Sequence, residues 1–492
     1  MPSKPTTRWQ VSGYRFLVRR MEHALVRRDV RMLHDPMRSQ SRAFAVGLVL
    51  ALVALAGCGV LALLRPQDKM GNSTILIGKD SGAVYVVIDG VVHPALNLAS
   101  ARLAAGEAAA PATVKESELG KKPRGQLIGI PGAPASLSFD DSGRGRAWTV
   151  CDTLASDGSG ELTTAVLAGD PELAEKAGPL AAGRALLVRG RESAYLVYDD
   201  RRARVDMNDR AVVDALGIRG MTPRPVSEGL LNAIPELLPI VPPPIADVGA
   251  APGYPLGDHR IGDVVQVRTD GSHYVVLADG LQPVSELTAD IVRNTYRATP
   301  TDTHIAQADR TAAPVSSALR VADYPAAAPE IIDGKDQPVA CLSWQPVPVA
   351  DKSEGSTRAE LTVLTGHTVP IPDRARLVSF AQADGSGPHA DAFYMPPGAG
   401  AYAQSTGIEP DSERRDSLFY ISDFGVRYGI VDLDAAKALG MDPDSVRPER
   451  APWQLIGLLA PGPALSRAAA MVAHDGVAPD ANPAKEPVRT QN

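Results

Sequence analysis

The stretch AFAVGLVLALVALAGCGVLALL, Ala43 to Leu64, decides the fold class, because none of its 22 residues is charged. A helix of this length reaches about 33 Å, enough to cross the roughly 30 Å hydrocarbon core of a bilayer. The sequence therefore predicts a transmembrane helix over residues 43–64. Its expected boundaries are Arg42 and Ala43 at one end, and Leu64 and Arg65 at the other.

A second interpretation treats part of this run as a lipoprotein signal, since Leu55-Ala56-Gly57-Cys58 fits a site of cleavage and cysteine lipidation. A secretory apolar region is shorter, about 7–15 residues, and follows a brief basic segment. Here 42 residues precede the run, which also continues past Cys58. An uncleaved anchor is favoured, with Cys58 as a small apolar residue of the span.

Charge differs between the two sides of the run. Residues 1–42 hold ten Lys and Arg against Glu22, Asp29 and Asp35, so their net charge is +7. The whole chain carries −7, which leaves −14 on residues 43–492. Basic flanks stay on the cytoplasmic side. We therefore expect a single-pass protein with residues 1–42 in the cytoplasm and the acidic C-terminal bulk outside it.

The basic tail has the pattern of an amphipathic helix between Trp9 and Asp29, with Ser12 as its expected cap. Such a helix can dock on a partner protein or lie on anionic headgroups. A solvated tail whose charges only set the topology is the simplest alternative. Docking is favoured because aromatic residues, 5% of the chain, gather here. The expected docking residues are Trp9, Val11, Tyr14, Phe16, Leu17, Arg19, Arg20 and Met21.

Beyond the run, four segments share the order strand, turn with Asp, strand and short helix. They span residues 83–103, 193–217, 272–292 and 417–440. Asp89-Gly90 and Asp279-Gly280 predict hairpin turns, since glycine tolerates the positive φ that such turns need. Asp89 and Asp279 are thus expected to be turn residues.

The spacing of these segments indicates a duplication. Asp89 precedes Cys151 by 62 residues, and Asp279 precedes Cys341 by the same number. The predicted fold is α+β and mostly β, with four hairpin-plus-helix modules around a central β domain in pseudo-twofold symmetry. The modules are assigned to residues 70–110, 180–234, 259–300 and 415–472, the central domain to 111–175 and 305–412, a Pro-rich semi-rigid linker to 235–258, and a disordered tail to 473–492.

With Cys58 in the span, Cys151 and Cys341 are the remaining cysteines. An oxidising compartment favours a disulfide between them, and two free thiols are the alternative. Closing this loop of 190 residues would stabilise the fold by about 5 kcal/mol in the chain-entropy model. The flanking Trp148 and Trp344 are expected to pack against the bridge.

Sequence motifs for catalysis are missing. No Gly-Lys pair belongs to a nucleotide-binding loop, and the nine histidines show no metal-ligand spacing. The chain also lacks the G-x-S-x-G motif of serine hydrolases. Asp140-Asp141 and Asp199-Asp200 are adjacent acids that we expect to be solvated in turns. We therefore expect no catalytic, cofactor or metal residues, and the acidic balance disfavours nucleic acid.

Several ordered motifs resemble the EccB family of type VII (ESX) secretion systems. They are QVSGYRFLVRR (10–20), ALVRRDVRM (24–32), LNLASARL (96–103), GIPGAP (129–134), WTVCDT (148–153) and GVRYGI (425–430). The resemblance implies a structural subunit of an inner membrane complex that dimerises through its periplasmic domain. It implies EccC, EccD, EccE and the mycosin protease as partners.

Members of that family are sometimes labelled ATPases, so ATP is the cofactor that the resemblance would imply, yet no residue here maps to that label. The alternative functions are an ATP hydrolase, a cell-wall hydrolase and a non-catalytic binder of wall polymers.

Overall fold

The computed structural model describes residues 6–31, 36–64, 71–139, 145–157, 159–296, 303–347, 358–381, 383 and 388–476. The chain forms two compact units, Met1–Gly71 and Asn72–Asn492. Arg65, the pair Asp140-Asp141 and most of the predicted disordered tail lie outside the described residues.

The N-terminal unit contains two helices, α1 (Arg8–Arg27) and α2 (Pro36–Leu64). Before α1, the backbone N–H of Thr7 donates to the Gln10 side chain at 3.0 Å. Thr7, and not the expected Ser12, is therefore the cap, since a Gln three residues into a helix satisfies the N–H of the cap residue. α1 ends at Arg28, which adopts a left-handed conformation with φ 56°.

Helix α2 contains the predicted span. Ser39–Leu61, with a mean hydropathy of 2.6, is long and apolar enough to cross a membrane. This window begins four residues before the predicted span, so Arg42 lies inside it rather than at its boundary. One cation near the end of a span is tolerated because its long side chain reaches the interface.

The C-terminal unit contains four small sheets with one order of elements. Each begins with three antiparallel strands and a helix. A fourth strand then pairs parallel to the first strand, and a second helix follows. The last segment runs parallel to the third strand. Sheet I consists of β1 (Ile75–Gly78), β2 (Val84–Ile88), β3 (Val91–Ala95), α3 (Leu98–Ala105), β4 (Ala112–Val114), α4 (Glu116–Leu119), β5 (Leu127–Ile128) and the C-terminal β27 (Ala473–His474).

Sheet II consists of β9 (Arg184–Arg189), β10 (Ala194–Tyr198), β11 (Arg201–Val205), α5 (Arg210–Ala215), β12 (Arg224–Pro225), α6 (Glu228–Ala233) and β17 (Glu330–Ile331). Sheet III consists of β13 (Val264–Val267), β14 (His273–Val276), β15 (Leu281–Val284), α7 (Glu286–Tyr296), β16 (His304–Ile305) and α8 (Gln307–Ala312). Sheet IV consists of β22 (Ala401–Thr406), β23 (Leu418–Ile421), β24 (Val426–Ile430), α9 (Leu433–Leu439), β25 (Glu449–Pro452), α10 (Trp453–Ile456) and β26 (Ala460–Pro461), and α11 (Arg467–Ala470) follows it.

Two of the hairpins turn on left-handed residues. Asp89 and Gly90 have φ of 49° and 79°, and Asp199 and Asp200 have φ of 46° and 58°. The hairpin before β15 differs from expectation, because its glycine, Gly280, has no positive φ. A Cβ there would lie 2.6 Å from a backbone oxygen of Pro314, so close approach of the chain requires the glycine.

The helix that follows each hairpin is capped by a short polar side chain. Each cap accepts a hydrogen bond from a backbone N–H of the first turn. The caps are Asn97 (2.8 Å), Asp209 (3.0 Å), Ser285 (3.2 Å) and Asp432 (2.7 Å).

Besides the four small sheets, the C-terminal unit contains a seven-stranded central sheet with the strand order β20-β21-β7-β6-β18-β19-β8. It consists of β6 (Trp148–Leu154), β7 (Leu162–Ala168), β8 (Ala177–Pro179), β18 (Val339–Val347), β19 (Arg358–Gly366), β20 (Val378–Ser379) and β21 (Ala392–Tyr394). β6 and β18 pair at its centre. β21 comes from the second half of the sequence but pairs with β7, and β8 comes from the first half but pairs with β19. Each half therefore supplies strands to the other.

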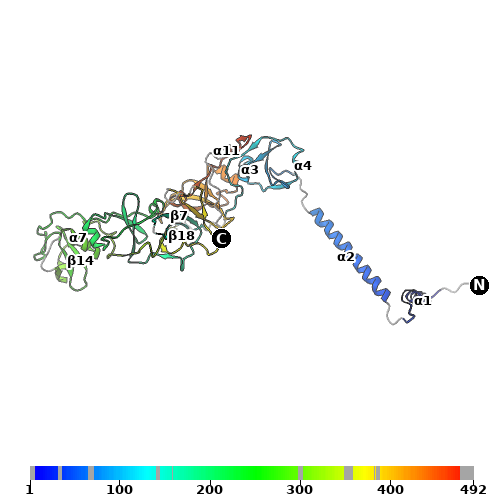
Figure 1. Ribbon diagram of the computed structural model, residues 1–492, viewed down its shortest axis with the longest axis horizontal. Helices are drawn as coiled ribbons and strands as arrows, with labels where there is room; N and C mark the ends of the chain where they lie inside the picture. The colour runs from blue at the N-terminus through cyan, green and yellow to red at the C-terminus, as the bar shows by residue number, and fades with distance from the viewer. Residues whose placement is uncertain are drawn as a thin grey trace, which may run out of the picture. The chain divides into compact units, whose positions relative to one another are not determined.

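Two pairs of small sheets share apolar cores, and sheets II and IV also pack on one face of the central sheet in a third core. Sheets I and IV share one apolar core, in which Leu103 of α3 and Leu439 of α9 take part. Sheets II and III share another, in which Val212 of α5 and Ile291 of α7 take part. Within this unit, α7 and β14 lie at one end, β7 and β18 in the middle, and α3 and α11 at the other end (Figure 1).

The small sheets include strands from outside the four module ranges that were assigned from the sequence. β4 and β5 join sheet I, although residues 111–175 are assigned to the central domain by sequence. β22 likewise joins sheet IV, although it falls in residues 305–412, and β16 joins sheet III although its second residue, Ile305, falls in that range. The hairpins were visible in the sequence, but the short strands that return to them were not.

The Pro-rich segment 235–258 begins as an added strand beside β11. Arg202 donates its backbone N–H to the Pro235 carbonyl at 2.9 Å, and Ile240 donates its own to the Arg204 carbonyl at 3.0 Å. The Tyr324 hydroxyl donates to the Val241 carbonyl at 2.8 Å. The first part of this segment, which was predicted to be a semi-rigid linker, is thus hydrogen-bonded to sheet II.

Candidate functional site

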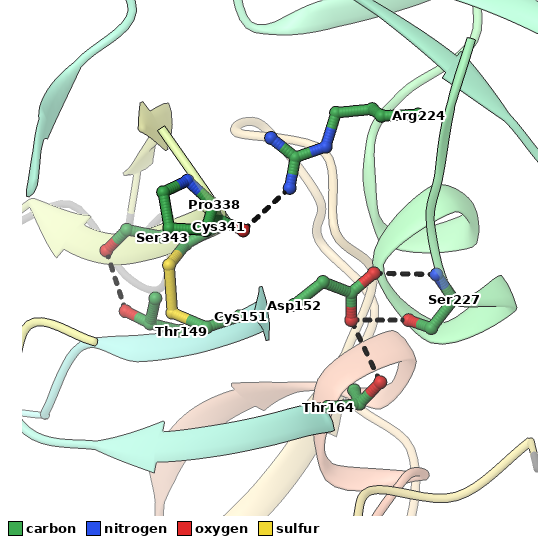
Figure 2. The surroundings of a disulfide bond; sticks show 9 residues. All are labelled: Thr149, Cys151, Asp152, Thr164, Arg224, Ser227, Pro338, Cys341 and Ser343. Carbon is green, nitrogen blue, oxygen red and sulfur yellow. Dashed lines mark hydrogen bonds between the residues drawn. A yellow bond between two sulfur atoms is a disulfide. The ribbon is translucent and has the colours of Figure 1, made fainter. Parts of the chain in front are cut away.

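A disulfide joins Cys151 and Cys341 at the centre of the central sheet (Figure 2). The two residues face each other in the register of β6 and β18, with their Cα atoms 4.0 Å apart. Both are fully buried. The bridge therefore links the two sequence halves at the place where their strands meet.

The expectation that Trp148 and Trp344 pack against this bridge is wrong. The two tryptophans lie in the apolar core on one face of the sheet, and the cysteines lie in a separate cluster. Each tryptophan is three residues from its cysteine. Because successive side chains of a strand point to opposite faces, an odd separation places them on different faces.

Beside the disulfide, the fully buried Asp152 accepts three hydrogen bonds (Figure 2). The donors are the Thr164 hydroxyl at 2.9 Å, the Ser227 hydroxyl at 2.8 Å and the Ser227 backbone N–H at 2.6 Å. Ser227 caps α6 and also accepts from the N–H of Leu230 at 3.0 Å. One carboxylate of the central sheet thus fixes the start of a helix from sheet II.

Arg224 connects the same part of sheet II to the start of β18. Its guanidinium donates to the carbonyl of Gln337 at 2.9 Å and to that of Pro338 at 2.8 Å. Burial lowers the pKa of Arg224 to about 10, although the nearby Asp152 opposes this. Burial also raises the pKa of Asp152, against the hydrogen bonds from Ser227 and Thr164.

Sequence reasoning missed this network of Asp152, Thr164, Arg224 and Ser227. The available signal was Asp152 itself, the one charged residue of the predicted strand WTVCDTL, because a charged residue in a buried strand needs partners. Since the partners come from other strands and from a helix, spacing could not identify them. The hydrogen bonds are all internal, so the arrangement supports packing of elements.

Asp200 is also structural, contrary to the expectation that the pair Asp199-Asp200 is solvated. Its carboxylate accepts from the backbone N–H of Val363 in β19 at 2.6 Å. Asp391 plays a comparable part, since it accepts from the N–H of Thr164 in β7 at 2.8 Å. Burial raises the pKa of Asp200. Asp279 accepts from the Ser316 hydroxyl at 3.1 Å.

Helix α1 is the second candidate, and its eight predicted docking residues are all exposed. Trp9 is 87% exposed, Tyr14 71% and Met21 66%. At 3.6 residues per turn, Tyr14 and Met21 share one face with Val11 and Leu17. Trp9 and Phe16 are seven residues apart and lie on another side, with Arg20. The predicted set therefore covers two sides of the helix rather than one.

Among the residues whose positions the structure describes, no cluster of three or more His, Cys, Asp or Glu side chains is suited to a metal ion.

Comparison with known proteins gives a match over nearly the whole chain. The family model described as "Type VII secretion system ESX-1, transport TM domain B" matches residues 3–479. The protein named ESX-1 secretion system ATPase EccB1 from Mycobacterium tuberculosis is 38% identical, over 98% of this chain and 98% of its own length.

Solved structures agree. A chain of the intact ESX-5 inner membrane complex has a TM-score of 0.74 and 33% identity, and covers 99% of both chains. In the periplasmic assembly of the ESX-5 complex the TM-score is 0.72 at 33% identity, over 85% of this chain and 100% of that chain. A chain of the EccB3 dimer from the ESX-3 core complex has a TM-score of 0.69 and 34% identity, and the match covers 82% of this chain and 100% of that chain. The chain therefore belongs to the EccB family of type VII secretion systems.

Proposed function

We propose that this chain is a structural subunit of an ESX inner membrane complex. Helix α2 anchors it, residues 1–42 lie in the cytoplasm, and the C-terminal unit lies in the periplasm. The observation that carries this proposal is a contrast in exposure. The Asp152 carboxylate beside the disulfide accepts hydrogen bonds from Ser227 and Thr164 of the same chain, whereas the apolar side chains Tyr14, Leu17 and Met21 of α1 are exposed.

The relatives support the location and the oligomeric role. One solved relative belongs to a periplasmic assembly of an inner membrane complex, and another is a dimer. The positive charge of residues 1–42 supports a cytoplasmic N-terminus. The proposed partners are the motor EccC, the membrane proteins EccD and EccE, the mycosin protease and a second copy of this chain.

The C-terminal unit is proposed to descend from a duplicated ancestor of two modules and a central segment. A twofold rotation about the disulfide would exchange sheet I with III and sheet II with IV. The packing of I with IV and of II with III agrees with such a rotation. The exchange of β8 and β21 between the halves joins both proposed copies in one central sheet.

An enzymatic role is the second candidate, because the EccB1 relative is named an ATPase. Lys79, Lys121 and Lys335 follow glycines but lack the rest of a nucleotide-binding loop. We favour a non-enzymatic role. Purified chain should show no ATP turnover that depends on these lysines, measured against a Lys79→Ala/Lys121→Ala/Lys335→Ala variant. Turnover that this variant abolishes would support the enzyme instead.

The structural role is tested by purifying the detergent-solubilised complex through a C-terminal tag and measuring its native mass. We expect an assembly with at least two copies of this chain and with the proposed partners, identified by mass spectrometry. Recovery of a lone 51.7 kDa chain from a strain that expresses the partners would contradict the proposal.

A further inference from the structure

Sheet I is the part of the C-terminal unit that follows the candidate membrane span in sequence. α2 ends at Leu64 and the unit begins at Asn72. Eight residue steps extend over about 28 Å at most, at about 3.5 Å per residue. If α2 spans the membrane, as proposed above, the first strand of sheet I is therefore tethered close to the outer membrane surface.

The strand register places the entry of the chain and a basic segment at one end of sheet I. The Thr74 carbonyl, just before β1, accepts from the N–H of Val87 at 2.7 Å, near the end of β2. β3 starts at this same end, because it follows β2 through a two-residue turn. There Val92 donates its N–H to the Pro123 carbonyl at 2.9 Å and pairs with Arg124.

This end carries exposed positive charge. Lys121, Lys122 and Arg124 are all exposed. Lys121 pairs with Glu118 at 2.6 Å. Lys122 and Arg124 have no ion-pair partner among the residues that the structure describes. Two further acidic residues lie at the same end, Asp89 in the adjacent turn and Glu107, whose carboxylate accepts from the Thr74 hydroxyl. Free cations here contrast with the net charge of −14 on residues 43–492.

We propose that this end of sheet I contacts the phosphate headgroups of anionic lipids in the outer leaflet, through Lys122 and Arg124. The inference rests on the proposed anchoring by α2. A basic residue near an anionic bilayer surface changes the contact equilibrium roughly fivefold. An arginine can also donate two parallel hydrogen bonds to one phosphate. The contact holds the first sheet of the periplasmic unit at the membrane.

The test uses the full chain in lipid nanodiscs, with a fluorophore at Gln126→Cys in a Cys58→Ala background. Gln126 is exposed and two residues from Arg124. Lipids with a nitroxide headgroup quench the fluorophore on contact. We expect stronger quenching in discs with 30% phosphatidylglycerol than in discs of phosphatidylcholine, and a loss of this difference at high salt.

Charge variants sharpen the test in both directions. Lys122→Gln/Arg124→Gln should weaken contact roughly 25-fold, from about fivefold per residue. Asp89→Asn should strengthen it, since Asn also tolerates the positive φ of this turn. Arg201→Gln/Arg204→Gln removes two exposed cations of β11 and should change nothing. Equal quenching in both lipids, or equal losses for the two double variants, would overturn the proposal.

A second readout separates this inference from the anchoring on which it depends. In the chain that retains Cys58, a membrane-impermeant maleimide should fail to label this residue of α2 in the discs. Labelling of Cys58 would overturn both the anchoring and the lipid contact. Protection of Cys58 without lipid-dependent quenching would overturn the lipid contact alone.

Discussion

The central sheet and helix α1 differ in the exposure of their tryptophan side chains. Trp148 and Trp344 are 0% and 2% exposed in the core beneath the sheet, whereas Trp9 of α1 is 87% exposed. The sheet also carries the disulfide and the saturated carboxylate of Asp152. Burial of aromatic surface stabilises a fold at roughly 25 cal/mol per Å². The central sheet buries this surface within its own chain, whereas the side chain of Trp9 is left exposed, as the proposed docking of α1 on a partner requires.

The largest expected effect concerns the disulfide. Cys151→Ala/Cys341→Ala should lower the free energy of unfolding by about 5 kcal/mol, because the unfolded chain gains the freedom of a 190-residue loop. Chemical denaturation of the detergent-solubilised chain measures it. Cys58→Ala, in α2, is the control and should leave the midpoint unchanged. Equal midpoints for the double variant and wild type would show that strand pairing alone holds the halves.

A matched pair of tryptophan substitutions tests the comparison itself. Trp344→Ala should cost about 4 kcal/mol, since it opens a cavity in a packed core. Trp9→Ala should change the same stability by less than about 0.5 kcal/mol, as exposed substitutions do. Thermal unfolding followed by near-UV circular dichroism measures both. Similar costs would mean that α1 is already packed in the isolated chain.

Asp152 should show a graded effect. Asp152→Ala leaves the N–H and hydroxyl of Ser227 without an acceptor and should cost about 3 kcal/mol. Asp152→Asn keeps an acceptor for that N–H and should cost about 1 kcal/mol. Denaturation midpoints of the two variants give the difference. An alanine variant as stable as the asparagine variant would show that the hydrogen bonds to α6 contribute little.

The smallest effect on stability should come from the apolar face of α1. Leu17→Glu/Met21→Glu should leave the unfolding of the C-terminal unit unchanged, because these side chains are 57% and 66% exposed. The same variant should lose partners when the complex is purified. Arg15→Gln/Glu22→Gln, two exposed polar positions of α1, is the matched control. Loss of partners by both variants would assign docking to charge rather than to the apolar face.

Local patterns predicted much of this molecule. The uncharged run predicted the one candidate span found among the described residues, and Asp89-Gly90 predicted a hairpin turn. Each of these signals is contained in one short continuous stretch of sequence. The cysteine pair was expected because Cys58 falls in the span and leaves two. Helix α1 followed from helical periodicity, which predicts a helix between Trp9 and Asp29.

Long-range contacts escaped the sequence. Nothing in the spacing of Asp152 points to Ser227, 75 residues away, because the two meet through tertiary packing. The exchange of β8 and β21 is invisible for the same reason, since strands of three residues carry little pattern. The side of the sheet that Trp148 occupies was available from strand alternation, and the expectation overlooked it.

The central claim is that α1 becomes buried only on binding partners, whereas the central sheet is fully packed within the chain. Hydrogen exchange tests this most directly when it is measured on the chain alone in detergent and again on the purified complex. Amides of Trp148–Leu154 and Val339–Val347 should be strongly protected in both samples. Amides of Arg8–Arg27 should exchange quickly in the free chain and at least about tenfold more slowly in the complex. Unchanged exchange in α1, or protection of the central sheet only in the complex, would contradict the account.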